Sequence, residues 1–320
     1  MLLCARVSHR HRIGADENGL GAHLGPLVVT AVLARTTEDG ERKVLGRPLP
    51  KRLRLDLGDS KDLVSHGDVA LGEAWARAIV GDEAQSPAEL FERFSSEAAP
   101  VLRQHCPSHV ESQCWSAKNE RFVAEQADVL RLRKHLENWA ARGVEVQAVR
   151  TRILCTKRLN DGRTLGRNRF VSDLHCMEHL VLELREIAGS DVLAVCGKVG
   201  GMNDYSSFFG PLSDRLHAVL ESGRKSSAYH FPGLGEVRFV RDADARDPLV
   251  MLASMVGKYV RELLMARVSK FHFDAHGDAE LESVSGYHDP VTARFVKATA
   301  LSRRKRDVPN DCFERARDPA

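Results

Sequence analysis

The feature that most constrains this chain is a pair of adjacent carboxylates that ends a short apolar run and is followed at once by glycines. Asp16 and Glu17 form the pair, Gly19 and Gly21 follow them, and a second apolar run begins at Pro26. Glycine lets a backbone turn tightly and approach a ligand closely. An acidic pair beside such a turn suits a hard divalent cation together with a phosphate-bearing substrate.

Taken alone, the acidic pair is also compatible with an ordinary surface position. Neighbouring residues of a regular strand point to opposite faces of the sheet. Asp16 and Glu17 can therefore reach one metal ion only if the strand ends between them and bends towards Gly19. The interpretation as a metal site depends on other segments of the chain.

The composition favours a soluble enzyme or binding protein with one or two domains. The chain has 320 residues, of which 43% are hydrophobic, 28% charged and 6% aromatic. Its net charge is only +3, so any nucleic-acid surface must be local. Two basic runs, residues 303–306 and 51–54, are candidates, although such runs are ordinarily solvated faces or tails.

The cysteines indicate a reducing compartment, and the apolar runs give no sign of a signal peptide or a membrane span. Seven cysteines without paired spacing are typical of free thiols. The apolar run in residues 1–6 is too short for a signal peptide, and no run approaches the roughly 20 apolar residues that a membrane span needs. We expect a monomeric cytoplasmic protein without membrane contact.

Alternating strand and helix patterns predict an α/β fold. Apolar and β-branched runs predict strands within residues 13–33 (two, joined by the glycine turn), 42–45, 143–154, 192–196 and 236–240. Helical spacing is present over residues 68–104, 118–142 and 172–187. A further helix starts with Asp247 as N-cap and Pro248 in the first position and continues to about residue 267.

Two further segments place polar groups at the ends of elements. Asp244 lies just before the helix that begins at Pro248, where the helix dipole favours a negative charge. On that helix, Ser254, Lys258 and Arg261 form a polar stripe that we expect opposite its apolar face.

Four motifs, taken in order, resemble the ribonuclease HII family. The motifs are residues 16–21 with Gly25-Pro26, then Asp59-Ser60-Lys61, then Asp244 with residues 253–261, then Ser285-Gly286-Tyr287-His288-Asp289-Pro290-Val291-Thr292. The resemblance runs from about residue 13 to residue 300, and the helical middle is its loosest part. Each motif alone is weak, but four in the right order are hard to obtain by chance.

The resemblance implies a ribonuclease H-like fold. Its mixed sheet would have antiparallel strands first and parallel ones after, with flanking helices and a C-terminal helical segment along the substrate groove. It also implies hydrolysis of RNA within RNA–DNA hybrids by two Mg²⁺ or Mn²⁺ ions. Asp16 and Glu17 match the first two of the family's four carboxylates, and Asp244 matches the last.

The resemblance also assigns substrate contacts. The family's Gly-Arg-Gly element corresponds to Gly19, Leu20 and Gly21, where the backbone would approach the 2′-OH that separates RNA from DNA. Tyr287 matches the tyrosine that stacks at the RNA–DNA junction. Lys258 and Lys61 would meet phosphates. The basic stretch near Arg303 would add to duplex binding.

Two positions depart from the family pattern. The third carboxylate slot holds Cys196 or Gly197, and Leu20 replaces the arginine between the two glycines. Asp191 cannot fill the slot, since five or six strand residues place it roughly 17–20 Å away. Asp204 could return to the slot through a turn at residues 200–201.

These departures lead to two functional hypotheses, a hybrid-cleaving ribonuclease with impaired turnover and a non-catalytic hybrid-binding pseudo-enzyme. We expect residues 1–267 to form the catalytic core, with a helical insertion at about 66–142. Residues 268–300 would form the substrate-groove segment. Residues 301–320 would form a basic, polar and partly disordered tail.

A rival motif lies on the helix over residues 172–187. His175, Glu178 and His179 match the H-x-x-E-H pattern of inverted zinc peptidases. Their spacing places both histidines on one helix face, opposite the apolar stripe. The ordinary interpretation of that face is a solvated one, and the sequence offers no convincing third zinc ligand.

Overall fold

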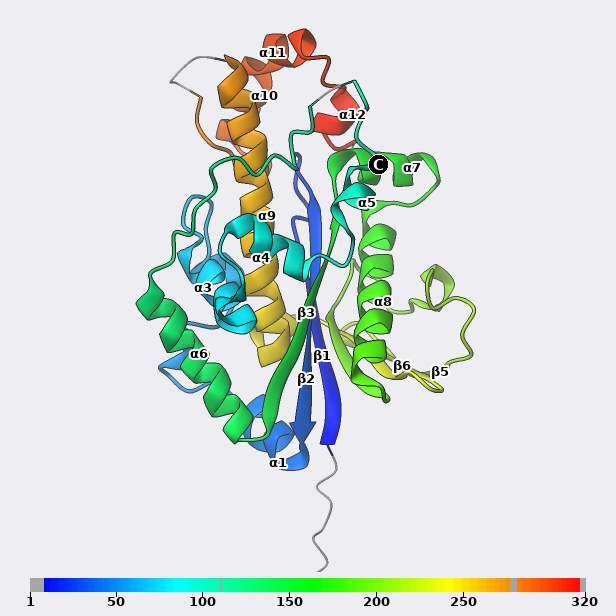
Figure 1. The fold of residues 1–320 in the computed structure, drawn as a ribbon. Helices are drawn as coiled ribbons and strands as arrows, with labels where there is room; N and C mark the ends of the chain where they lie inside the picture. Colours follow the sequence, from blue (N-terminus) through cyan, green and yellow to red (C-terminus); the bar gives the residue numbers. More distant parts are fainter. Residues whose placement is uncertain (1–8, 110, 277–280, 317–320) are drawn as a thin grey trace, which may run out of the picture.

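A seven-stranded mixed sheet forms the centre of the computed structural model, which describes residues 9–109, 111–276 and 281–316 (Figure 1). The strands are β1 (His9–Asn18), β2 (Leu27–Thr37), β3 (Val144–Leu154), β4 (Val192–Gly197), β5 (Ala218–Ser222), β6 (Ser226–Phe231) and β7 (Gly235–Val240). Their order across the sheet is β3-β2-β1-β4-β7-β6-β5.

The strand directions confirm the expected mixed sheet. β1, β2 and β3 are antiparallel neighbours, while β4 runs parallel to β1 and β7 runs parallel to β4. The hairpin of β5 and β6, which the sequence did not predict, extends the sheet beyond β7 in antiparallel fashion. Because β1 lies between β2 and β4, the acidic pair at its end is in the middle of the sheet.

Helices and short helical turns cover both faces of the sheet. They are α1 (Glu38–Gly40), η1 (Glu41–Leu45), η2 (Leu53–Leu55), α2 (Ser60–Leu63), α3 (Ala70–Val80), η3 (Gly81–Glu83), α4 (Pro87–Phe94), α5 (Ala99–Arg103), α6 (Gln126–Ala141), α7 (Thr156–Thr164), α8 (Arg169–Ala188), η4 (Ser206–Phe208), η5 (Ala243–Ala245), α9 (Pro248–His276), α10 (Pro290–Ala298), α11 (Ala300–Lys305) and α12 (Asn310–Phe313). In Figure 1, α8 lies on one side of the sheet, and α9 with α3 and α6 lies on the other.

Alternate strand residues enter two separate cores. On β2, Val28 and Val32 pack with α9 and the helices of residues 66–142, whereas Val29 and Leu33 pack with α8. This is the two-residue period of a strand buried on both faces. The same alternation along β1 turns Ile13 and Ala15 towards α8.

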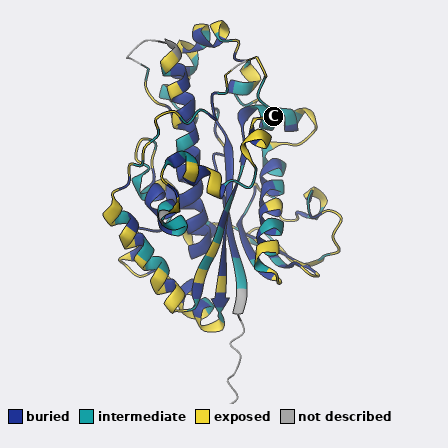
Figure 2. Ribbon diagram, in the orientation of Figure 1, coloured by how far each residue is buried: buried dark blue, intermediate teal, exposed yellow. Residues whose placement is uncertain are grey.

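The long helix α9 lies close against the sheet because two glycines lack side chains. A methyl group at Gly14 of β1 would lie 2.4 Å from the Leu249 carbonyl carbon, and one at Gly257 would lie 2.9 Å from the hydroxyl of Thr30 on β2. The Asp247 carboxylate caps the helix by accepting from the backbone N–H groups of Leu249 and Val250. Figure 2 shows α9 and the central strands as the most deeply buried elements.

Several predicted boundaries were wrong. Helix α9 continues to His276 instead of about residue 267, because Val268 and Phe271 are buried in cores contributed by other segments. Residues 42–45 are helical rather than a strand, since Thr37 caps a helical turn there and the following residues stay helical.

The helical regions of the insertion are also more broken than predicted. Gly81, with a φ of +79°, ends α3, and Ser86 with Pro87 starts α4, so residues 68–104 form several short helices. Helix α6 begins at Gln126 rather than at 118. The insertion helices bury Trp75, which lies in one core with α9.

Residues 301–316, expected as a basic polar tail, form helical turns that pack on the rest of the chain. The Arg303 side chain is buried, with its guanidinium 3.9 Å from the centre of the Phe313 ring. Arg306 donates to the Phe271 carbonyl, which leaves Arg304 and Lys305 as the exposed members of the basic run.

The six cysteines in the described residues form no disulfide, and Cys4 lies outside them. Residues 1–6, judged too short for a signal peptide, also lie outside the described part of the chain. None of the described helices is long and apolar enough to cross a membrane.

Candidate functional site

Asp16 and Glu17 reach one point at the end of β4 from opposite faces of the sheet. β1 stays regular through both residues, so the strand end that a shared metal ion was expected to require does not lie between them. Instead, β4 ends at Gly197, beside them. A methyl group at Gly197 would lie 2.9 Å from Asp16 Oδ1 and 3.3 Å from Glu17 Oε2. Because Gly197 has no side chain, the two carboxylates can approach each other across the sheet edge.

Asp244 and Lys61 lie beside this pair. Asp244 is in η5, three residues before the Asp247 cap of α9, and Lys61 Nζ lies 3.9 Å from Asp244 Oδ2. The Ser60 hydroxyl forms a hydrogen bond of 2.8 Å with the Ser254 hydroxyl of α9. The Asp59-Ser60-Lys61 motif is therefore held against the same helix that Asp244 precedes.

Negative charge is concentrated at this site. Burial, followed by the charges of Glu17 and Asp244, raises the pKa of Asp16 well above its usual value. Burial, followed by the charges of Asp173 and Asp244, likewise raises the pKa of Glu17. Partial burial acts to lower the pKa of Lys61, but the surrounding carboxylates outweigh it and raise that pKa. Excess negative charge at one place is what a bound cation would offset.

Asp173, on α8, is a member of this charged group that sequence reasoning missed. It is fully buried, and neither carboxylate oxygen has a hydrogen-bond partner. Burial and the charge of Asp16 raise its pKa well above the usual range. In the sequence it appears only as one polar residue beside the apolar stripe of a helix, so no local pattern could have singled it out.

One face of α9 runs from the acidic pair to the glycine turn. Ser254, Lys258 and Arg261 lie on this face as the predicted polar stripe, and all three are buried. The Asn18 amide donates to the Ser254 carbonyl. Gly19 has a φ of +89°, and a methyl group there would lie 2.3 Å from Arg261 Nε. Only glycine fits this close approach of the turn to the helix.

Tyr287 lies against the same face. Its ring centre is 4.5 Å from the Arg261 guanidinium carbon and 5.6 Å from Lys258 Nζ. Glu262 accepts from Arg261 at 2.9 Å and lies 3.2 Å from Lys258 Nζ. Its carboxylate therefore pairs with both cations. The loop that carries Tyr287 is tied to the glycine turn, because the N–H groups of residues 23 and 24 both donate to the Gly286 carbonyl.

Arg315 is a second residue that sequence reasoning missed. Its guanidinium donates to the carbonyls of Gly19 at 2.6 Å and Gly25 at 2.8 Å. Burial, with the positive charge of Arg261, lowers the pKa of Arg315 to about 9. Leu20, by contrast, packs its side chain against the core on the α8 side. Gly21 faces open space.

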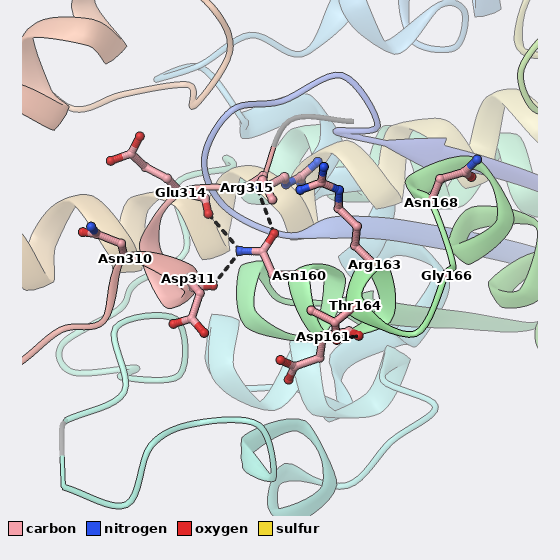
Figure 3. A pocket seen from close by; sticks show the side chains of 11 residues that line it. Asn160, Asp161, Arg163, Thr164, Gly166, Asn168, Asn310, Asp311, Glu314 and Arg315 are labelled. Atoms are coloured by element: carbon pink, nitrogen blue, oxygen red, sulfur yellow. Dashed lines mark hydrogen bonds between the residues drawn. The ribbon is translucent and has the colours of Figure 1, made fainter. Parts of the chain in front are cut away.

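Arg315 also lines a cavity of about 850 Å³ between α7 and α12 (Figure 3). Asn160 joins the two walls, since its amide donates to the carbonyls of Asp311 and Glu314. Asp16, Glu17 and Asp244 do not line this cavity. Arg315 connects it to the glycine turn.

Two candidates from the sequence have other partners. Asp204 Oδ1 accepts from the Tyr229 hydroxyl and the Ser206 N–H, both at 2.9 Å, so it does not fill the third carboxylate slot. Of the two residues expected at that slot, Cys196 is fully buried and Gly197 lies beside the carboxylates of Asp16 and Glu17.

The zinc-peptidase motif is engaged by the segment after β4. Glu178 accepts from the N–H groups of Gly210 and Leu212, and burial raises its pKa to about 7. His175 Nε2 lies 3.0 Å from the Phe208 carbonyl oxygen. His179 is on the exposed side of α8.

Among the described residues, no group of three or more His, Cys, Asp or Glu side chains has an arrangement that could hold a metal ion. The donor set at the sheet edge nevertheless fits a hard divalent cation. It consists of carboxylate oxygens, and those of Asp173 are buried without any partner.

Comparison with known proteins finds no matching family model and no matching curated protein. Among solved structures, Bst-RNase HIII in complex with Mn²⁺ is 12% identical, with a TM-score of 0.43 over 97% of this chain and 67% of that one. RNase HII in the PCNA complex from Archaeoglobus fulgidus is 15% identical, with a TM-score of 0.40 over 97% of each chain.

The ribonuclease H2 from Pyrococcus horikoshii OT3 is also 15% identical, with a TM-score of 0.39 over 93% of this chain and 90% of that one. Similarity of this degree assigns no function to this chain. Its function is therefore inferred from the geometry of its own residues.

Proposed function

We propose that this chain is a divergent ribonuclease HII-like protein that binds RNA–DNA hybrids and hydrolyses their RNA with Mg²⁺ or Mn²⁺. The observation that carries the proposal is the meeting of Asp16 and Glu17 at Gly197 from two faces of the sheet, within the electrostatic reach of Asp244. Carboxylate oxygens from separate elements, gathered at one sheet edge, are the ligands that hard cations prefer.

The three carboxylates would hold the cations and orient the scissile phosphate between them. When bound, such ions activate a water molecule and stabilise the leaving 3′ oxygen. Lys61, exposed beside Asp244, would contact a neighbouring phosphate. Its ammonium would thus offset the phosphate charge at the acidic edge.

The turn at residues 19–21 would recognise the ribonucleotide. Gly21 faces open space, so the backbone there is free to approach a 2′-OH. Tyr287 would stack on a nucleobase at the junction, because its ring is fixed between Lys258, Arg261 and the loop at Gly286.

A second candidate function is hybrid binding without cleavage. Gly197 supplies no carboxylate at the slot beside the acidic pair, and Leu20 supplies no charge to the substrate. Removing a group that acts in the transition state lowers turnover more than binding. We therefore expect binding to be retained in both cases, with cleavage weak under the first candidate function and absent under the second.

The test is an assay of the purified protein on an RNA–DNA hybrid and on a duplex with one ribonucleotide, with Mg²⁺, Mn²⁺ or a chelator. We expect slow cleavage that requires the cation, disappears in Asp244→Asn and persists in Asp242→Asn. Asp242 is the matched control, since it is exposed in the same turn and lies 3.7 Å from Arg241.

Binding that does not distinguish a hybrid from a DNA duplex would overturn both candidate functions. Hybrid-specific binding without cleavage under either cation would select the second one. Cleavage at equal rates in Asp244→Asn and the parent would remove Asp244 from the mechanism.

A further inference from the structure

The sheet-facing side of α8 carries one carboxylate among apolar residues. Asp173, Met177, Leu180 and Leu184 follow one another at helical spacing, and all four are fully buried. The three apolar members pack against the strands in one core. Asp173 lies in the first turns of the helix, next to the end of β1.

This carboxylate is buried without a hydrogen bond to compensate for the loss of water. Neither oxygen of Asp173 has a hydrogen-bond partner. A buried unsatisfied polar group costs about 1–3 kcal/mol, and an apolar residue would pack there without that cost. Glu178, one turn further on the same buried helix, shows the usual solution, because its carboxylate accepts two backbone N–H groups.

The surroundings of Asp173 are the other carboxylates. Its charge is the leading electrostatic cause of the raised pKa of Glu17, and the charge of Asp16 acts on Asp173 in turn. The charges of Asp173 and Asp16 also contribute to the raised pKa of Cys196, the residue before Gly197. Cys196 also packs in one core with Met177, one turn after Asp173 on α8, and with Ala15, which shares its face of β1 with Glu17. Asp173 is therefore on the α8 side of the end of β4, the same side as Glu17.

We propose that Asp173 supplies, from α8, an oxygen ligand for a divalent cation shared with Asp16 and Glu17, in place of the side chain absent at Gly197. This inference rests on the proposed function for the class of cation. It requires a site that is built from two elements of the sheet and one helix. The buried oxygens of Asp173, which have no hydrogen-bond partner, would then bind the ion.

The experiment measures Mn²⁺ binding to the full chain without nucleic acid, by the electron paramagnetic resonance signal of free Mn²⁺. We expect Asp173→Asn to weaken binding about tenfold or more, because it removes a charged ligand and keeps the volume of the side chain. Asp173→Glu, which keeps the carboxylate, should recover part of the affinity. Glu178→Gln is the matched control and should bind within about twofold of the parent.

A second readout separates ligation from folding. Without metal, Asp173→Asn should melt at or above the temperature of the parent, since an unpartnered carboxylate is removed. The rise in melting temperature that Mn²⁺ produces in the parent should shrink. Asp173→Asn that fails to fold, or that melts lower without metal yet keeps the full Mn²⁺-induced rise, would make Asp173 structural and overturn the proposal.

The outcomes also separate this inference from the proposed function. Mn²⁺ binding that depends on Asp173, in a protein without hybrid binding, would keep the cation site and reject the ribonuclease. Hybrid cleavage that persists in Asp173→Asn with unchanged Mn²⁺ affinity would keep the ribonuclease and reject Asp173 as a ligand. A parent protein that binds no Mn²⁺ at millimolar concentration would overturn the inference.

Discussion

Lys61 Nζ lies 3.9 Å from the carboxylate of Asp244, although the two residues come from opposite halves of the chain. The charges of Asp16 and Glu17 also act to raise the pKa of Lys61, whose side chain is exposed. It therefore stands between the buried carboxylates and solvent. A phosphate backbone that approaches the acidic edge would meet this positive charge first.

Replacing Lys61 by methionine should weaken hybrid binding and leave the affinity for Mn²⁺ equal or higher. One phosphate contact is lost, so the slope of log affinity against log salt should fall by about one. Binding titrations at several salt concentrations measure this slope. Lys43→Met is the control, because Lys43 pairs with Asp39 beyond the far end of β2. An unchanged slope in Lys61→Met would remove Lys61 from the binding surface.

Tyr287→Ala should weaken binding to a duplex with an RNA–DNA junction. Stacking of a base on an aromatic ring contributes about 1–3 kcal/mol, which corresponds to roughly 5- to 150-fold in affinity. Tyr287→Phe keeps the ring and should bind like the parent. Fluorescence anisotropy with a labelled junction duplex measures both variants. Equal affinity of Tyr287→Ala and the parent would show that the ring only packs against Arg261.

Gly197→Asp and Cys196→Asp should behave differently, although the sequence left both as slot candidates. A carboxylate at position 197 enters between Asp16 and Glu17 and should increase both Mn²⁺ affinity and hybrid cleavage. Without metal it should lower stability, because three like charges are then crowded together.

Cys196→Asp places a carboxylate in the apolar core beside Asp173, so it should destabilise the protein without raising cleavage. Cleavage assays and metal-free melting curves of both variants test these expectations. Higher cleavage in Cys196→Asp alone would reverse the assignment of the slot.

His272 should make the protein sensitive to acid. Burial, with the charges of Arg303 and Arg306, lowers its pKa to about 3, against about 6.5 in an unfolded chain. Between these values the unfolded chain binds a proton that the folded chain does not. Stability from this group is therefore complete above about pH 6.5 and is lost as the pH falls towards 3, by up to about 1.4 kcal/mol per pH unit.

Denaturant unfolding between pH 4 and 7 measures this loss. His272→Gln should lower stability at pH 7, where the contact of His272 with Gln113 is changed, but should flatten the decline towards acid. His230→Gln, at an exposed position of β6, should leave the decline as it is. A parallel decline in His272→Gln and the parent would contradict the prediction.

The sequence predicted the elements whose signals are local. β1, β2, β3, β4 and β7 follow apolar or alternating runs, and Asp247 with Pro248 marks the start of α9. The predicted site residues do lie close together, because the charge of Asp244 contributes to the raised pKa of both Asp16 and Glu17. Their roles as metal ligands stay predictions.

The parts that the sequence did not reveal depend on contacts between distant segments. Asp173 matters only because α8 crosses the end of β1, and Arg315 only because the last described residues return to Gly19. Asp204 is a candidate for the third carboxylate in the sequence, but it accepts a hydrogen bond from Tyr229 of the hairpin that the sequence does not predict. No periodicity or spacing within one segment carries such information.

The single helix α9 fixes the distance between the two halves of the site. Ser254 lies at the acidic pair and Arg261 at Gly19 and Tyr287, seven residues or about 10 Å along the helix axis. One residue inserted between them would turn everything beyond it by about 100° and break every contact at Gly19 at once. Homologous chains should therefore tolerate substitutions on the outer side of this stretch far more readily than any change in its length.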